Sequence, residues 1–216
     1  MVGTTDPHEG WHQGAALDMV PLSDADLDRA QGAAWVVDSS AGPLDKKRQR
    51  LRMLEGLGVR AALTASTTAT LAAQQTWLTG SMRLVGCDPL LMMAGGSVQT
   101  VVQATDGDLA WLSAVWPDRK FVGVADSVGL VFSREILPII NEAVDFFSQG
   151  VTEDEIDQGA RLGLNYPRGP LAWAKLFGWP QVFWGLRALQ DMYGTRFQPH
   201  PWIRARLGSS LLDGGE

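Results

Sequence analysis

Cysteine, histidine and positive charge are scarce in this chain of 216 residues. The single cysteine, Cys87, excludes an intramolecular disulfide and a zinc site of several thiolates, and it favours a reducing compartment. The 18 lysines and arginines are outnumbered by 24 aspartates and glutamates, and the net charge of -6 argues against electrostatic binding to nucleic acid or to an anionic membrane. Three dispersed histidines, His8, His12 and His200, indicate no metal site.

Long apolar runs are also missing. Because no run of apolar residues is long enough to cross a bilayer, no membrane-spanning helix is predicted. The segment from Met1 to Pro21 has no basic stretch followed by an apolar run, which is the pattern of a targeting peptide. We therefore expect a cytoplasmic protein. With 45% hydrophobic residues, the chain can bury one core or two small ones packed together.

From residue 33 to residue 124, apolar runs alternate with helical patterns. The runs predict strands at 33–37, 59–65, 82–86, 97–102 and 120–124. Helical spacing or capping residues predict helices after 23–26 and at 44–57, 71–75 and 109–116. This alternation is typical of a parallel α/β sheet. Residues 1–17 have little periodicity and predict no element.

Beyond Asp126 the strand pattern stops, and only helices are predicted. Val128–Gln149 has a wide apolar face, which must be buried by other helices or by a partner chain. Thr152 opens a capping box, and Pro170 opens the next helix, where its missing N–H costs nothing. The chain is therefore divided into an N-terminal extension at 1–30, an α/β domain at 31–126 and an all-α domain at 127–216.

Several ordered motifs in the second half resemble one family. Glu155–Asp157 and Leu162–Leu171 match the helix-turn-helix signature of 3-hydroxyacyl-CoA dehydrogenases, with Tyr166 where histidine is commoner. Asp126–Gly129 resembles the entry into that family's C-terminal domain, and 193–202 continues the match. The resemblance implies an α/β half-Rossmann domain with a parallel sheet. An all-α domain like the C-terminal domain of 6-phosphogluconate dehydrogenase would follow it.

The residues that carry the family's chemistry are replaced. In the family a Gly-x-His sequence supplies the general base, and a Glu twelve positions later orients the imidazole. Asp88 and Thr100 stand at these two positions here. The GxGxxG turn that receives the pyrophosphate is missing, because the nearest string, 56–61, follows a helix and precedes a strand. The run 33–37 resembles the family's fourth strand, so the mononucleotide-binding half is expected to be absent. No cofactor is therefore expected in the isolated chain, although the family uses NAD.

The resemblance also assigns roles to residues of the loop that follows the predicted strand 59–65, and to residues of the helical half. It implies substrate-binding positions at Ser66, Thr67, Ser133 and Asn165, and a core and dimer helix that includes Ile136, Pro138, Ile140 and Asn141. Some long family members carry a second copy of the C-terminal module behind a remnant of the nucleotide fold. This chain is most similar to that second copy.

Three functions are compatible with these features. The first is a homodimeric, non-catalytic relative in the degradation of fatty or aromatic acids, which binds an acyl-CoA or docks beside a catalytic dehydrogenase subunit. The second is a dehydrogenase subunit that a separate NAD-binding chain completes. The third, a lyase or hydratase that uses Asp88 with Ser66 or Thr67, is remote because the sequence offers this carboxylate no partner.

Three other features each have a plain structural interpretation, which we favour. Lys46–Arg52 could bind the phosphates of coenzyme A, but such charge runs are usually the solvated face of a helix. Asp88 before Pro89 could be a base, but this dipeptide commonly begins a turn. The nine tryptophans could line an acyl pocket, but aromatic residues more often fill cores and dimer contacts.

Overall fold

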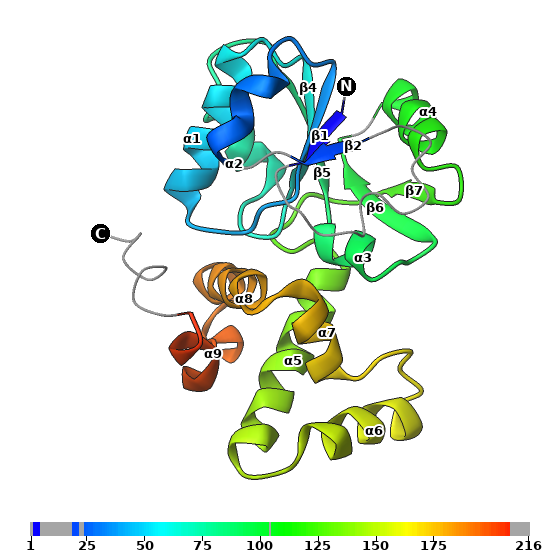
Figure 1. The fold of residues 1–216 in the computed structure, drawn as a ribbon, viewed down its shortest axis with the longest axis vertical. Coiled ribbons are helices and arrows are strands. Elements are labelled where there is room, and N and C mark those ends of the chain that lie inside the picture. Colours follow the sequence, from blue (N-terminus) through cyan, green and yellow to red (C-terminus); the bar gives the residue numbers. More distant parts are fainter. Residues whose placement is uncertain (1, 5–18, 22–23, 104, 208–216) are drawn as a thin grey trace.

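The computed structural model describes residues 2–4, 19–21, 24–103 and 105–207. It contains a sheet with helices, followed by a group of helices packed against one end of that sheet (Figure 1). The change from strands to helices falls at residues 124–131, close to the predicted position at Asp126. None of the described helices is long and apolar enough to cross a membrane.

The sheet has seven strands in the order β2-β1-β3-β4-β5-β6-β7. Their bounds are β1 Val2–Thr4, β2 Met19–Pro21, β3 Trp35–Asp38, β4 Ala61–Ala65, β5 Arg83–Cys87, β6 Val98–Val102 and β7 Lys120–Gly123. All neighbouring pairs are parallel except β5 and β6, which are antiparallel. The predicted parallel sheet is therefore confirmed for most strand pairs, and the antiparallel pair β5 and β6 is the exception. Residues 88–97, which connect β5 to β6, are fewer than the dozen or so that a parallel crossover needs.

Two strands of the sheet were not predicted from the sequence. β1 lies beside β3 and β2 lies beside β1, all parallel, so the order β2-β1-β3-β4-β5 corresponds to 2-1-4-5-6 of a doubly wound fold. The expectation that this half of the fold is absent needs correction, because two of its strand positions are filled. Three residues per strand are too few to produce a period-two pattern in a sequence.

Helices of this part cover the two faces of the sheet (Figure 1). They are the 3-10 helix η2 Asp24–Ala30 and the α-helices α1 Leu44–Gly56, α2 Leu71–Gln75, α3 Pro89–Met93 and α4 Asp106–Val115. The helix α4 begins three residues earlier than predicted. Thr105 caps it by accepting a hydrogen bond from the backbone N–H of Asp108, whose carboxylate in turn accepts from the backbone of Thr105.

The helical part forms its own apolar core. It contains α5 Phe132–Ser148, α6 Glu153–Gly163, α7 Pro170–Phe177, α8 Trp179–Tyr193, the 3-10 helix η3 Thr195–Phe197 and α9 Pro201–Ala205. The apolar face of α5 is buried by other helices of the same chain, so Ile136 and Ile140 lie in this core. Asn141 fastens the C-terminal segment to α5, donating to the carbonyl of Gln198 and accepting from the N–H of His200.

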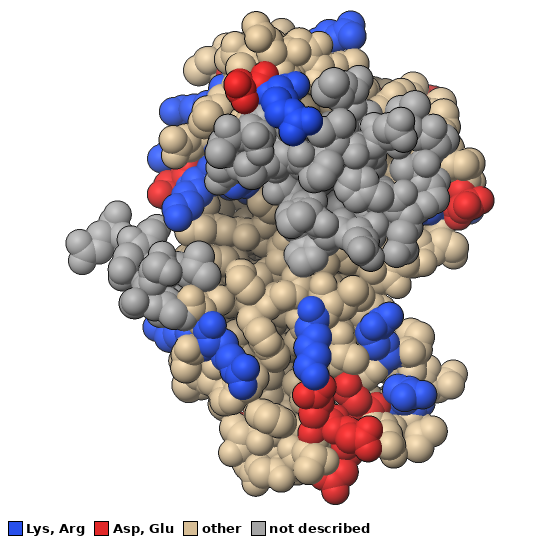
Figure 2. Space-filling view, viewed as in Figure 1, with Lys and Arg blue, Asp and Glu red and all other residues tan. Residues whose placement is uncertain are grey.

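The signature around residues 155–171 has a structural explanation. The Asp157 carboxylate accepts the backbone N–H groups of Leu171 and Ala172, which are free at the start of α7. Pro170 has no N–H to satisfy there, and a Cβ at Gly169 would overlap the Asp157 side chain. Figure 2 shows acidic side chains gathered over the helical part, where the first turn of α6 is acidic. Such a surface repels polyanions.

Candidate functional site

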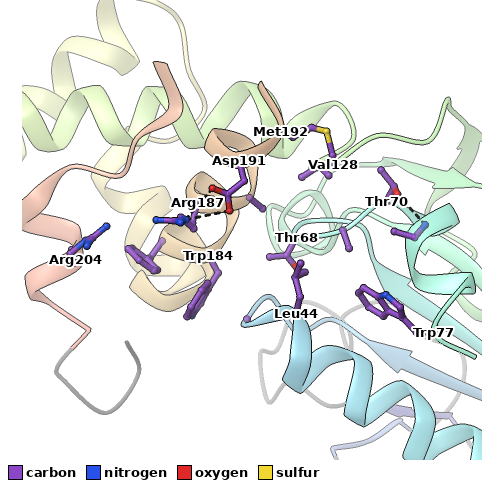
Figure 3. Close-up of a pocket in the computed structure, with 15 residues that line it drawn as sticks. Leu44, Thr68, Thr70, Trp77, Val128, Trp184, Arg187, Asp191, Met192 and Arg204 are labelled. Carbon is purple, nitrogen blue, oxygen red and sulfur yellow. Dashed lines mark hydrogen bonds and ion pairs between the residues drawn. The ribbon is translucent and has the colours of Figure 1, made fainter. Parts of the chain in front are cut away.

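A cavity of about 560 Å³ lies between the sheet part and helix α8 (Figure 3). On one side it is lined by the loop that follows β4 and by α2, which contribute Thr68 and Thr70, and by Trp77 just beyond them. On the other side it is lined by α8, with Trp184, and by Arg204 of α9. In an α/β sheet the carboxyl ends of the strands are the usual place for a ligand, and β4 ends here.

The buried side chain of Gln74 fixes the loop after β4. Its amide nitrogen donates to the carbonyl oxygens of Ala65 and Ala69, at 2.9 and 3.0 Å, and its amide oxygen accepts from the Thr64 hydroxyl at 2.7 Å. The end of the strand and the loop are thereby tied to α2, so the loop is held in one conformation.

Three consecutive hydroxyl groups of this loop have no hydrogen-bond partner among the described residues. Ser66, Thr67 and Thr68 are all buried, and Thr68 lines the cavity. Gly185 lets α8 pack closely against α5 and this loop, because a Cβ there would stand 2.5 Å from Leu137 and 3.3 Å from the Thr67 methyl group. Buried hydroxyls usually find a partner, but the Thr68 oxygen is itself covered by protein, so it reaches a ligand in the cavity only after its side chain rotates.

Asp88, at the predicted position of the catalytic base, is held by four hydrogen bonds. One carboxylate oxygen accepts from the N–H groups of Leu90 and Leu91 and, at 2.7 Å, from the Ser133 hydroxyl. The other accepts from the backbone N–H of Ser133 at 2.9 Å. Burial raises the pKa of Asp88, while the bonds from Ser133, Leu91 and Leu90 oppose that shift. Asp88 therefore caps α3 and ties the sheet to α5, so a helix begins where the sequence favoured a turn.

Of the other predicted site residues, Ser133 bonds to Asp88, and Thr100 follows across from Asp88 in register because Cys87 pairs with Val101 of β6. Thr100 lies on β6, paired with Val122 of β7, and its hydroxyl has no partner among the described residues. Asn165 is exposed in the turn between α6 and α7, where it adopts a left-handed backbone with φ of 56°. The structure thus brings Ser66, Thr67 and Ser133 to the side of the sheet that faces the helices, but not Asn165.

The basic run on α1 is divided between solvent and the interior. Lys46 and Arg48 are exposed, as expected, but Lys47 is buried with its Nζ 2.8 Å from the Asp38 carboxylate at the end of β3. Arg50 adds a second charge 3.5 Å from the same carboxylate. Burial alone would raise the pKa of Asp38, but Lys47, Arg50 and the hydrogen bonds from Lys47 and Ser40 bring it well below its usual range. Lys47 is thus a structural ion-pair partner.

Metal and thiol chemistry find no support in the described part of the chain. No group of three potential metal ligands occurs there, and His200 accepts a hydrogen bond from the N–H of Trp202 at the start of α9. His8 and His12 lie outside the described residues. Cys87 is buried, and burial raises the pKa of its thiol, so it is a poor nucleophile.

The sequence did not point to most of the cavity's helical wall. Trp184 was among the tryptophans considered for an acyl pocket, but Arg187, Met192 and Arg204 carry no motif. They reach the cavity only because α8 and α9 fold back toward the loop after β4. Each belongs to a helix whose position depends on tertiary packing.

Residues 129–212 match the family model described as "3-hydroxyacyl-CoA dehydrogenase, C-terminal domain". The 3-hydroxyadipyl-CoA dehydrogenase of Escherichia coli K12 is 37% identical over 129 residues, which are 57% of this chain and 26% of that protein. The 3-hydroxybutyryl-CoA dehydrogenase of Clostridioides difficile is 27% identical over 218 aligned residues, covering 93% of this chain and 72% of the relative. The chain thus spans about a quarter of the first of these relatives.

Solved structures are similar in the same way. The 3-hydroxybutyryl-CoA dehydrogenase of E. coli K12 superimposes with a TM-score of 0.59 and 31% identity over 68% of this chain and 31% of that one. The (S)-3-hydroxybutyryl-CoA dehydrogenase of Ralstonia eutropha superimposes with a TM-score of 0.61, at 20% identity, over 89% of this chain and 70% of that one. The second likeness is one of fold.

Proposed function

Because the chain belongs to the 3-hydroxyacyl-CoA dehydrogenase family, we propose that it binds an acyl-CoA thioester in the cavity beside α8 without transferring hydride by itself. One observation carries the second half of this proposal, namely that Asp88 is buried and accepts four hydrogen bonds from Leu90, Leu91 and Ser133. A general base must direct a free lone pair at the proton that it removes. All the hydrogen bonds of Asp88 support the fold instead.

The residues at the carboxyl end of β3 do not fit a dinucleotide. The positive charges nearest this strand end, Lys47 and Arg50, are directed at Asp38. The loop that follows is held against α8, because the backbone N–H of Ala41 donates to the side-chain oxygen of Gln181 at 3.2 Å. The sequence after β1 also lacks the GxGxxG spacing that brings backbone N–H groups to a pyrophosphate.

The cavity supports the first half of the proposal. Its volume falls within the roughly 300–1,000 Å³ of small-molecule sites, and most of its wall is apolar. Trp77 and Trp184 lie on opposite sides of it in Figure 3, and Thr68 lies between them. Rotation of the Thr68 side chain would let its hydroxyl, which is covered in this structure, donate to a thioester carbonyl while the acyl chain packs against the two indole rings.

Isothermal titration with acetoacetyl-CoA and, separately, with NADH tests this function. We expect heat of binding from the thioester and none from NADH. Thr68→Val should weaken the thioester by about fivefold, the value of one neutral hydrogen bond, without loss of folding stability. Thr76→Val, which removes an exposed hydroxyl that does not line the cavity, is the matched control. Binding of NADH, or equal thioester affinity in both variants, would contradict the proposal.

We also propose that two copies of the chain associate through α6. No residue of this helix is buried, and Leu162 and Leu164 at its end are 81% and 64% exposed. Large exposed apolar side chains of this kind are typical of an interface. Leu162→Asp should shift sedimentation toward the monomer, whereas Gln158→Asp on the same helix should not. A wild-type protein that sediments as a monomer at micromolar concentration would refute the association.

A further inference from the structure

The charged side chains of the cavity are confined to its helical wall. Among the lining residues only Arg187, Asp191 and Arg204 carry charge, and all three belong to α8 or α9. The wall formed by the sheet part offers hydroxyls and apolar groups. The cavity therefore has a positively charged wall with a formal excess of one positive charge, opposite the wall that presents Thr68.

We propose that the ligand carries a carboxylate or phosphate group that binds Arg204, while an apolar part of the same molecule packs against Trp184. This inference rests on the proposed thioester-binding function and specifies the ligand of that same cavity. The anionic group has two chemical sources within such a ligand. It is either a carboxylate at the far end of the acyl chain or a phosphate of the coenzyme A part.

Arg204 is the cation whose charge is left for a ligand. Arg187 is already paired, with its Nε 3.2 Å from the Asp191 carboxylate on the next turn of α8, and Figure 3 shows this pair. Arg204 has no carboxylate partner within the described part of the chain, and its guanidinium carbon lies 5.9 Å from the ring centroid of Phe183. A guanidinium beside an aromatic wall binds a carboxylate or phosphate through two parallel hydrogen bonds.

The rim of the cavity indicates an apolar body for the same ligand. Leu44 and Met192 line the cavity and are about half exposed. Together with the two indole rings they form a surface that a ligand would remove from water. An anion alone would leave this surface uncovered, and a neutral lipid would leave Arg204 without a partner. An amphiphilic anion covers the apolar surface and also pairs with Arg204.

Calorimetric titrations with two probes that differ only in the terminal carboxylate show which anion binds Arg204, the acyl carboxylate or a phosphate of coenzyme A. Hexanoyl-CoA ends in a methyl group and adipyl-CoA ends in a carboxylate, with the same number of acyl carbons. Each is titrated into the wild-type protein, into Arg204→Gln and into Arg206→Gln. Arg206 is the matched control, because it lies two residues away, stacks at 4.1 Å on the Trp202 ring and does not line the cavity.

If the acyl carboxylate binds Arg204, adipyl-CoA should bind about tenfold more tightly than hexanoyl-CoA, and Arg204→Gln should remove that difference. If a phosphate binds it, both probes should bind alike and both should weaken about tenfold in Arg204→Gln. Arg206→Gln should change neither affinity. Equal affinities in wild type and Arg204→Gln for both probes would overturn the inference and leave the proposed function intact. No binding of either probe to the wild-type protein would overturn both.

Discussion

Replacing Asp38 by Asn should destabilise the protein by about 3–5 kcal/mol, because it leaves the charge of Lys47 buried without its counter-ion. Both side chains are almost completely buried, and their charged atoms are 2.8 Å apart. In the wild type, Lys47 has one further acceptor, the carbonyl oxygen of Ser40 at 3.3 Å, which cannot neutralise it. Urea denaturation followed by tryptophan fluorescence measures the free energy of unfolding.

The double variant Asp38→Asn/Lys47→Met completes a thermodynamic cycle. Because it removes both charges, its loss of stability should be smaller than the sum of the two single losses by about 0.5–3 kcal/mol.

The pH dependence of the Asp38 contribution to stability has a defined sign. The pKa of Asp38 is lower in the folded protein than in the unfolded chain, where it is about 3.9, so its stabilisation is present above that pH and is lost as the pH falls below it.

The stability difference between wild type and Asp38→Asn should therefore shrink on acidification. Lys47→Met alone should also destabilise, but less, because Arg50 remains 3.5 Å from the Asp38 carboxylate. A stability of Asp38→Asn equal to or above that of the wild type, together with tighter phosphate binding, would refute this reasoning. Lys47 would then be a ligand-binding residue whose charge Asp38 neutralises in the absence of ligand.

Three further substitutions test other parts of the structure. Gly169→Ala should cost about 1–3 kcal/mol of unfolding free energy, because its Cβ would overlap Asp157, and an unchanged urea midpoint would contradict that packing. Ser133→Ala should cost about 1 kcal/mol, since the backbone N–H of the same residue still binds Asp88, and a gain in stability would indicate a functional, strained carboxylate. Gln74→Leu should lower the free energy of unfolding by about 3 kcal/mol, because three buried hydrogen bonds are lost. It should also weaken thioester binding measured by calorimetry. Unchanged binding would show that this loop is not part of the binding site.

The sequence predicted the main elements of this fold because each carried a local signal. The alternation of apolar runs and helices marked the α/β part, and the end of the strand pattern near Asp126 marked the helical part. The strands β1 and β2 were missed because three residues give no periodicity. The direction of β6 was missed because apolar periodicity does not report strand direction, which here follows from the short connection at residues 88–97.

The sequence led only to the loop beside the cavity. The resemblance indicated Ser66 and Thr67, which lie in the loop that contributes Thr68 to the cavity but do not line it themselves. The contact between Asp88 and Ser133 joins residues 45 positions apart and depends on how α5 docks on the sheet. Arg204 reaches the cavity from a five-residue helix at the other end of the chain, and no local pattern could place it there.

The proposed function predicts thioester binding without hydride transfer, because the hydrogen bonds of Asp88 support the fold. The most direct test is the rate of NADH formation when a high concentration of the purified chain is mixed with 3-hydroxybutyryl-CoA and NAD. We predict no formation above the protein-free rate, in a preparation whose thioester binding has been established by calorimetry. Sustained NADH formation that disappears in Asp88→Ala would contradict the account and identify Asp88 as a working base.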